Sequence, residues 1–361
     1  MGLSGATVLL TGGSSGIGAA TARTLAAAGA RVLVAGRNAA RLRAVAAETG
    51  GIALEADLAA PDGPAALAVA AIRAAANWDV ASADGHEAAA DPVPLQVRNG
   101  RSPLESAPLP AHVTLESLAD LEAHVPAAIP GPGIRPAPLA AESPLPKTDG
   151  RLPQPNGRPP ETARLAMPTG AAAVPMQVPG PPPARGSGID ILINNAGVGW
   201  AGPLTEMSAA KVAQLVAVNL TAPIELTRLL TPALAASGRG RVVFISSIAG
   251  ATGAPQEAVY AATKAGLNYF AESLRYELAG TGVGVSVVVP GVIDTPFFAR
   301  RGRPYNRRRP VPISAQRVGR AVLTVIEREQ PVAFVPRWLG FPAWLHGAVP
   351  GTFRALAARF A

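Results

Sequence analysis

Tyr260 and Lys264, in the stretch Tyr-Ala-Ala-Thr-Lys, are the residues whose types and spacing point most directly to chemistry. Residues four apart on a helix share one face, so the phenol and the ammonium can lie side by side. Such a pair offers a proton donor next to a cation. The chain also contains a glycine-rich turn, Thr-Gly-Gly-Ser-Ser-Gly-Ile-Gly, at 11–18. Together the pair and the turn indicate hydride-transfer chemistry, whereas either alone would be a weak signal.

The glycine-rich turn has the surroundings that a dinucleotide-phosphate site needs. An apolar run precedes it and an alanine-rich segment follows, which is the order strand, turn, helix. In this interpretation Gly12 makes the tight turn, Gly16 lets the backbone approach a pyrophosphate, and Gly18 lets the helix pack closely on the strand. The helix N-terminus adds N–H donors and a positive dipole. The predicted contacts from this turn are Gly12, Ser14, Ser15, Gly16, Ile17 and Gly18.

The cofactor variant can be predicted from the end of the second strand. NAD-type sites place an acidic residue there for the ribose hydroxyls, but this chain has Gly36 followed by Arg37. A guanidinium can pair with a 2′-phosphate, so we predict NADP(H) rather than NAD(H). Asp57, next to Leu58 at the end of the third strand, could accept a hydrogen bond from the adenine amino group or could cap a helix.

The distribution of apolar residues predicts an α/β domain with a doubly wound, seven-stranded parallel sheet. Near-continuous apolar runs separated by alanine-rich amphipathic segments are typical of strands that are covered by helices on both faces. The predicted strands are Ala6–Leu10, Arg31–Ala35, Gly51–Ala56, Asp190–Asn194, Arg241–Ser246, Gly284–Val289 and Val332–Val335.

A proline-rich stretch interrupts this pattern. Of the 37 prolines, 22 lie between Pro92 and Pro183, and so proline-rich a segment with few aromatics cannot bury enough apolar surface to fold. We therefore predict a disordered insertion at 77–186 and a discontinuous catalytic domain at 1–76 and 187–335. Within the insertion, Leu115, Leu118, Leu121 and Val125 follow helical spacing, as a transient helix or a partner-binding element.

The insertion follows the predicted helix Pro64–Ala76 and precedes the fourth strand. That helix runs back from the carboxyl ends of the strands, where ligands bind in such folds. We therefore expect the insertion to leave from the edge opposite the ligand site.

Composition excludes several classes of function. The chain has 361 residues and no cysteine, which excludes disulfides and thiolate chemistry. Three of its four histidines lie in the insertion and His346 is alone, so no metal site is predicted. The net charge of +8 comes mostly from scattered arginines without interleaved aromatics, which argues against nucleic acid. No apolar run has membrane-spanning length and the N-terminus does not read as a signal peptide, so a cytoplasmic protein is expected.

With these features in place, the chain resembles the short-chain dehydrogenase/reductase family of Rossmann-fold oxidoreductases. The matching residues are the glycine turn, Asn194-Asn195-Ala196-Gly197, Ser247 thirteen residues before Tyr260, Lys264, and Pro290-Gly291. Asn219, in Val-Ala-Val-Asn-Leu, matches a fourth catalytic position. The resemblance covers nearly all of the chain outside the insertion and about the last 25 residues; the long insertion is the departure from the family's pattern.

The resemblance implies a role for each matching residue. Tyr260 is the general acid or base, Ser247 hydrogen-bonds the developing alkoxide, Lys264 also holds the nicotinamide ribose, and Asn219 orders a water that relays protons. Further cofactor contacts are implied at Asn195, Ala196, Gly197, Pro290, Gly291, Val292 and Thr295. The implied reaction interconverts a carbonyl and a secondary alcohol, as in a carbonyl reductase, and the implied assembly is a dimer or tetramer formed through the helices that carry Asn219 and Tyr260.

Charge near Tyr260 predicts its titration. A free tyrosine titrates near pH 10, and Lys264 beside it, aided by the positive nicotinamide of an oxidised cofactor, would favour the phenolate. We therefore expect a lowered pKa for Tyr260 in the complex.

Three questions stay open at this stage. Pro296–Pro312, with Phe297, Phe298, Tyr305 and many arginines, occupies the substrate-lid position and is expected either to favour an acidic or thioester-linked substrate or to be a solvated loop. Trp200 and 251–256 are expected to line the pocket with it. The apolar, basic segment 336–361 could cover the pocket, pack at a subunit interface or make weak contact with a membrane surface, and we favour packing.

Alternatives to the carbonyl reductase also remain. The same scaffold could carry out a dehydration, an epimerisation or an enoyl reduction, which the complete Ser247, Tyr260 and Lys264 set disfavours. A regulatory NADP(H)-binding protein could use the insertion to recruit partners. The insertion could also be an accident of gene fusion.

Overall fold

A parallel sheet organises the part of the chain that the computed structural model describes, which is residues 2–83, 188–306, 308 and 310–357. Its strand order is β3-β2-β1-β4-β5-β6-β9, and all neighbours pair in parallel. The strands are β1 (Thr7–Thr11), β2 (Arg31–Gly36), β3 (Ile52–Glu55), β4 (Ile191–Asn194), β5 (Arg241–Ile245), β6 (Gly284–Pro290) and β9 (Val332–Val335). A small second sheet pairs β7 (Ile293–Asp294) with β8 (Ile313–Ser314). The predicted seven-stranded doubly wound sheet is thus confirmed, and no predicted strand end differs from the observed one by more than one residue.

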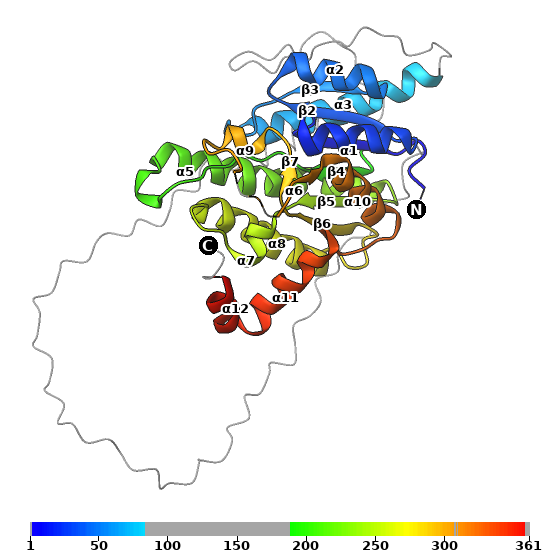
Figure 1. Cartoon of the computed structure of the whole chain (residues 1–361). Helices are drawn as coiled ribbons and strands as arrows, with labels where there is room; N and C mark the ends of the chain where they lie inside the picture. Colours follow the sequence, from blue (N-terminus) through cyan, green and yellow to red (C-terminus); the bar gives the residue numbers. More distant parts are fainter. Residues whose placement is uncertain (1, 84–187, 307, 309, 358–361) are drawn as a thin grey trace, which may run out of the picture. The chain divides into compact units, whose positions relative to one another are not determined.

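Helices cover both faces of this sheet (Figure 1). Those between the strands include α1 (Gly16–Ala27), α2 (Ala39–Thr49), α3 (Gly63–Ala83), α5 (Ala209–Val216), α6 (Ala222–Ala236), α8 (Ala258–Glu277) and α10 (Ala315–Glu327). The others are η1 (Leu204–Glu206), the π turn η2 (Ala217–Thr221), α7 (Ile248–Thr252), α9 (Phe297–Arg300), η3 (Arg337–Leu339), α11 (Gly340–Ala348) and α12 (Pro350–Ala357). No helix in the described residues has the length and apolar character to cross a membrane.

The two faces form separate cores because side chains alternate along each strand. On one face Leu9, Leu33 and Leu54 pack with the apolar sides of α3, α6 and α8. On the other face Val8 and Leu10 pack with α1, α2 and α10. Both faces are apolar, so the strands lack the polar side that an antiparallel sheet exposes.

The helix that precedes the insertion is longer than predicted. We expected Pro64–Ala76, but α3 continues to Ala83. Trp78 explains part of the extension. Its ring packs against the core that α3 covers, and the ring centroid lies 5.9 Å from Cζ of Arg31. The remainder of the predicted insertion, including the helical pattern at Leu115 to Val125, lies outside the described residues.

The described chain resumes at Gly188, directly before the amino end of β4. Asp190 is buried here, accepts a hydrogen bond from Thr7 N at 2.7 Å and pairs with Arg239 at 2.9 Å. These contacts join the first residues of β1 and β4 at the edge opposite the carboxyl ends of the strands. The chain therefore re-enters the domain on the side away from the expected ligand site.

Candidate active site

A cleft of about 1390 Å³ lies at the carboxyl ends of the strands and collects most of the predicted site residues. The switch point between β1 and β4 opens into it, which is where doubly wound sheets bind ligands. The predicted residues that line it are Gly12, Ser14, Ser15, Gly16, Ile17, Gly18, Arg37, Asp57, Leu58, Asn195, Ala196, Gly197, Ser247, Tyr260, Lys264, Pro290, Gly291, Val292 and Thr295.

The glycine-rich turn has the backbone geometry of a phosphate cradle. Gly12 and Gly16 have φ of +68° and +56°, a left-handed conformation that disfavours side chains. At Gly18 a Cβ would lie 2.1 Å from the Gly12 carbonyl oxygen and 2.7 Å from Asn195 Nδ2. Only glycine allows α1 to start this close to the strand. The cradle therefore leaves the N-terminus of α1 open to the cleft.

Arg37 sits where the cleft meets the end of β2, and its side chain is exposed. Arg41, which sequence reasoning missed, lines the same region from the first turn of α2. Asn38 is committed to capping α2, since its Oδ1 accepts from Arg41 N at 2.9 Å. Asp57 uses its Oδ1 to accept from Ala59 N at 3.0 Å, which closes a turn ahead of α3 and does not cap that helix. This end of the cleft therefore presents two guanidiniums.

Tyr260 and Lys264 are both buried on α8, and both side chains reach the cleft. Lys264 Nζ donates to the Ile245 carbonyl oxygen at 2.8 Å, which anchors it to the end of β5. Ser247 caps α7, accepting from Ala249 N at 3.2 Å, and it also hydrogen-bonds Tyr260. Tyr260 belongs to a small apolar cluster with Leu215, Ala249 and Ala261, against which Phe297 packs.

Asn219 is the one predicted catalytic residue that does not line the cleft. It is fully buried in the π turn η2, and its amide exchanges two hydrogen bonds with the Val198 backbone, at 2.8 and 2.9 Å. A third hydrogen bond runs to Thr263 on α8. Asn219 therefore fixes the loop after β4. It remains near Lys264, because a Cβ built on Gly197 would lie 3.4 Å from Asn219 Oδ1 and 3.6 Å from Lys264 Nζ.

Burial dominates the titration of the pair. It raises the pKa of Tyr260 to about 12; the hydrogen bond with Ser247 lowers that pKa, the Glu257 carboxylate raises it and the Arg301 guanidinium lowers it. Burial also lowers the pKa of Lys264 to about 8. The protein alone therefore holds Tyr260 as a neutral phenol, opposite to the shift that we expect in a complex. The desolvation of a phenolate outweighs the charges that the chain itself supplies.

The shift at Lys264 predicts how stability depends on pH. Between roughly pH 8 and 10.5 the folded chain binds fewer protons at Lys264 than the unfolded chain, so the free energy of unfolding rises with pH there. Across this window we expect the free energy of unfolding of wild type to rise by roughly 3 kcal/mol relative to that of Lys264→Met. Urea unfolding of both proteins at several pH values measures it. If the difference in free energy of unfolding between the two proteins did not change with pH, the lowered pKa of Lys264 would be refuted.

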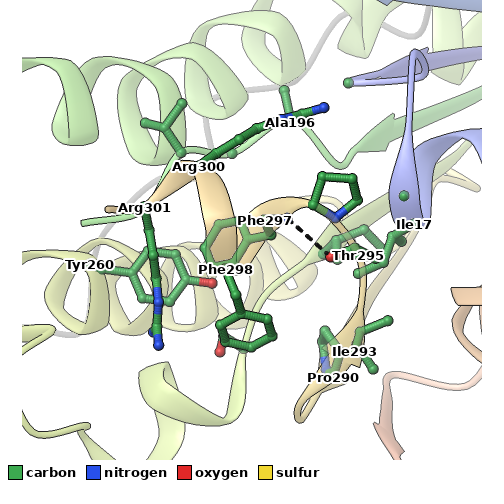
Figure 2. Close-up of a pocket in the computed structure, with 18 of the residues that line it drawn as sticks. Ile17, Ala196, Tyr260, Pro290, Ile293, Thr295, Phe297, Phe298, Arg300 and Arg301 are labelled. Carbon is green, nitrogen blue, oxygen red and sulfur yellow. Dashed lines mark hydrogen bonds between the residues drawn. The ribbon is translucent and has the colours of Figure 1, made fainter. Parts of the chain in front are cut away.

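The segment after Thr295 folds over the cleft rather than projecting from it. The Phe297 ring lies 5.5 Å from that of Tyr260 and 5.7 Å from that of Phe298, which in turn lies 5.3 Å from Tyr305. Figure 2 shows Tyr260, Phe297 and Phe298 gathered together with Arg301 beside them. Arg301 stacks 4.6 Å over Phe298 and pairs with Glu257, just before α8. The aromatic residues expected in the lid thus form one wall of the site.

Arg300 is a second residue that the sequence did not single out. Its guanidinium donates to Ser15 Oγ at 3.2 Å, which places a lid cation at the glycine-rich turn. The arginine-rich composition of the lid was visible in the sequence, but this contact spans 285 residues and has no local signal.

Two expected parts of the pocket lie elsewhere. Trp200 does not line the cleft and packs in the cluster around Tyr260, while from 251–256 only Gly253, Ala254, Pro255 and Gln256 face the cleft. None of the described residues after β9 lines it. Residues 336–357 therefore do not cover the pocket, which was one of the three roles that we considered for the C-terminal segment.

A family model for short chain dehydrogenases matches residues 6–80 and 183–306, which is more than half of the chain. The chain belongs to the short-chain dehydrogenase family. The two matched parts flank the predicted insertion. The match also contains the glycine-rich turn, Asn219, Ser247, Tyr260 and Lys264.

Curated relatives match a smaller part of the chain than the family model does. The ketoacyl reductase HetN of Nostoc sp. is 47% identical over 106 residues, which is 29% of this chain and 37% of the relative. Nodulation protein G of Rhizobium sp. is 42% identical over 108 residues, or 30% of this chain and 44% of the relative. The matched stretch thus spans less than half the length of these relatives.

Solved structures of the family have the same fold. A short-chain dehydrogenase from Sphingobium yanoikuyae in complex with NADPH has a TM-score of 0.58 at 23% identity, covering 98% of this chain and 95% of its own. A metagenomic short-chain oxidoreductase in complex with NADP has a TM-score of 0.51 at 25% identity; the match covers 92% of this chain and 96% of that one.

Proposed function

We propose that this family member is an NADP(H)-dependent oxidoreductase that interconverts a carbonyl and a secondary alcohol. The observation that carries the proposal is one continuous cleft, with the glycine cradle and Arg37 at one end and Ser247, Tyr260 and Lys264 at the other. The name of the ketoacyl reductase relative supports a carbonyl substrate. The proposed catalytic domain is discontinuous, built from the residues before the insertion and those after it up to 335.

The cradle fits a dinucleotide. Glycine at 12, 16 and 18 lets the turn pack closely on its neighbours, because a Cβ there would lie 2.8 Å from Ala196 Cα, 3.1 Å from Thr295 Cγ2 and 2.1 Å from the Gly12 carbonyl oxygen. This close packing leaves the N-terminus of α1 able to offer N–H donors to phosphate. Arg300 adds a cation at Ser15, and Arg37 and Arg41 are placed for a 2′-phosphate. The structure of the metagenomic relative with NADP supports this choice. When bound, the nicotinamide ring exchanges a hydride with the substrate carbon.

The side chains of this chain handle the proton. In reduction, Tyr260 Oη donates its proton to the substrate oxygen while Ser247 hydrogen-bonds the same oxygen. A neutral phenol suits this direction, because the raised pKa keeps Tyr260 protonated at neutral pH. Lys264, held by the Ile245 carbonyl, keeps a positive charge on the same helix face and holds the nicotinamide ribose. Asn219 supports the site indirectly, because its amide is bonded to Val198 and Thr263 and fixes the loop after β4.

The test is an absorbance assay of NADPH oxidation by the full chain against ketones, aldehydes and ketoacyl thioesters, repeated with NADH. We expect turnover of at least one carbonyl class and a preference for NADPH. No turnover across the panel, with NADPH still binding, would overturn the proposed activity.

The cofactor preference has its own prediction. Arg37→Asp puts a carboxylate where a 2′-phosphate would lie and where NAD-type sites accept ribose hydroxyls. We expect the ratio of kcat/KM for NADPH over NADH to fall by about 100-fold, since losing a charge-assisted contact and gaining repulsion costs about 3 kcal/mol. Arg43→Asp, on α2 outside the cleft lining, is the matched control. An unchanged ratio in Arg37→Asp would refute the role of Arg37.

A further inference from the structure

Three aromatic side chains near the C-terminus are largely exposed to solvent. Trp338, Phe341 and Trp344 are 59%, 66% and 64% exposed. They recur every third residue along η3 and α11, and the Phe341 and Trp344 rings lie 6.1 Å apart. We call these three residues the C-terminal aromatic patch. Clustered exposed rings of this size mark a site of interaction rather than ordinary surface.

The charge in the segment that carries this patch has one sign. Arg337 and Arg354 are exposed beside it, and the sequence from Pro331 to the C-terminus contains no aspartate or glutamate. Some exposed basic residues elsewhere in the described chain have acidic partners, as Arg23 has Glu48 and Arg228 has Glu225. The surface that the patch presents is therefore aromatic and basic.

The three patch residues belong to neither of the two cores, and none of them lines the cleft. In Figure 1, α11 and α12 lie outside the layers of the sheet, with α11 packed on α7 and α12 packed on α11. His346 on α11 meets Phe353 on α12 with ring centroids 5.0 Å apart, which ties the two helices together. Val349 and Leu356 extend the exposed apolar surface onto α12. The exposed rings can thus contact a partner without entering the cleft.

We propose that the C-terminal aromatic patch docks this protein on the surface of an anionic lipid bilayer. Tryptophan and phenylalanine rings settle at the level of lipid headgroups, and arginines beside them pair with anionic phosphates. A second copy of the chain is a poorer partner. A two-fold contact brings the same patch of both copies together, so Arg337 and Arg354 would face like charges with no carboxylate from this segment.

Co-sedimentation of the full chain with lipid vesicles tests the proposal. We expect binding to vesicles of phosphatidylcholine and phosphatidylglycerol at 3:1, and weaker binding to pure phosphatidylcholine or at high salt. Replacing Trp338, Phe341 and Trp344 together by serine should reduce binding at least about 100-fold, because three buried rings are lost. Arg337→Gln with Arg354→Gln should reduce it about 25-fold, at about fivefold for each charge near the surface.

Matched controls use exposed residues outside the patch. Tyr269→Ser with Tyr276→Ser removes two exposed rings from α8, and Arg317→Gln with Arg320→Gln removes two exposed charges from α10. Both double variants should bind vesicles like wild type, and circular dichroism should show that every variant is folded. Absence of vesicle binding by wild type would overturn the proposal. So would a triple serine variant that binds vesicles normally but loses a dimer detected by light scattering.

Discussion

Tyr260→Phe is expected to lower kcat for carbonyl reduction by about 10²–10⁴-fold, the usual contribution of a positioned general acid. The phenylalanine ring keeps the contacts of Tyr260 with Phe297 and with the small cluster around α7 and α8. It removes only the hydroxyl that hydrogen-bonds Ser247. The fold and the glycine cradle should therefore be unchanged, and so should the affinity for NADPH.

Steady-state kinetics and a fluorescence titration with NADPH measure these two effects separately. Tyr269→Phe is the matched control, because it removes a hydroxyl from an exposed ring of the same helix. We expect that control to keep full turnover. Substantial activity in Tyr260→Phe would sink the proposed acid–base role, whereas loss of NADPH binding would show that Tyr260 is a structural residue of the cleft.

Gly18→Ala is expected to damage both stability and cofactor binding. The new Cβ would lie 2.1 Å from the backbone oxygen of Gly12, so the first turn of α1 must move away from the glycine-rich turn. Overpacking of this kind costs about 1–3 kcal/mol or more. The movement also withdraws the N–H groups that face the phosphates, so we expect NADPH to bind about 10–100-fold more weakly.

Urea unfolding and an NADPH titration test this prediction. Gly347→Ala is the control, since Gly347 is also a helical glycine but a Cβ there would meet no atom within 4 Å. That variant should gain about 0.5–1 kcal/mol of stability from its better helix propensity. If Gly18→Ala were as stable as wild type and bound NADPH equally well, close packing of α1 at the turn would not be needed.

The sheet could be predicted from the sequence because each strand carries its own signal. Val8, Leu9 and Leu10, for example, are apolar in succession, which only a strand buried on both faces needs. The end of α3 carried no such signal, since alanines run past Ala76 and the packing of Trp78 depends on residues far away in sequence. Helix ends set by tertiary contacts are not visible in local patterns.

The candidate site was predictable to a similar degree and for the same reason. Tyr260, Lys264 and the glycine turn stand out by spacing, and the structure brings them to one cleft. The contact of Arg300 with Ser15 and the pairing of Arg301 with Glu257 depend on how the lid folds back, which spacing does not encode. The raised pKa of Tyr260 in the protein without cofactor was not visible for another reason: sequence shows nearby charge but not burial, and burial sets the direction of this shift. The lowered pKa that we expect in the complex with oxidised cofactor stays a prediction. The proposed roles of these residues and the oligomeric state stay predictions.

The pairing of β1 with β4 sets the order of events during synthesis. Thr7 and Asp190, which join these strands, are 183 residues apart. At about 5–20 residues per second, the ribosome needs roughly ten to forty seconds to make β4 after β1. During that interval β1 can pair with β2 on one side only, and its other edge is open to strands of other chains. We expect the nascent chain to depend on chaperones, and shortening the segment between α3 and β4 to raise the yield of folded protein.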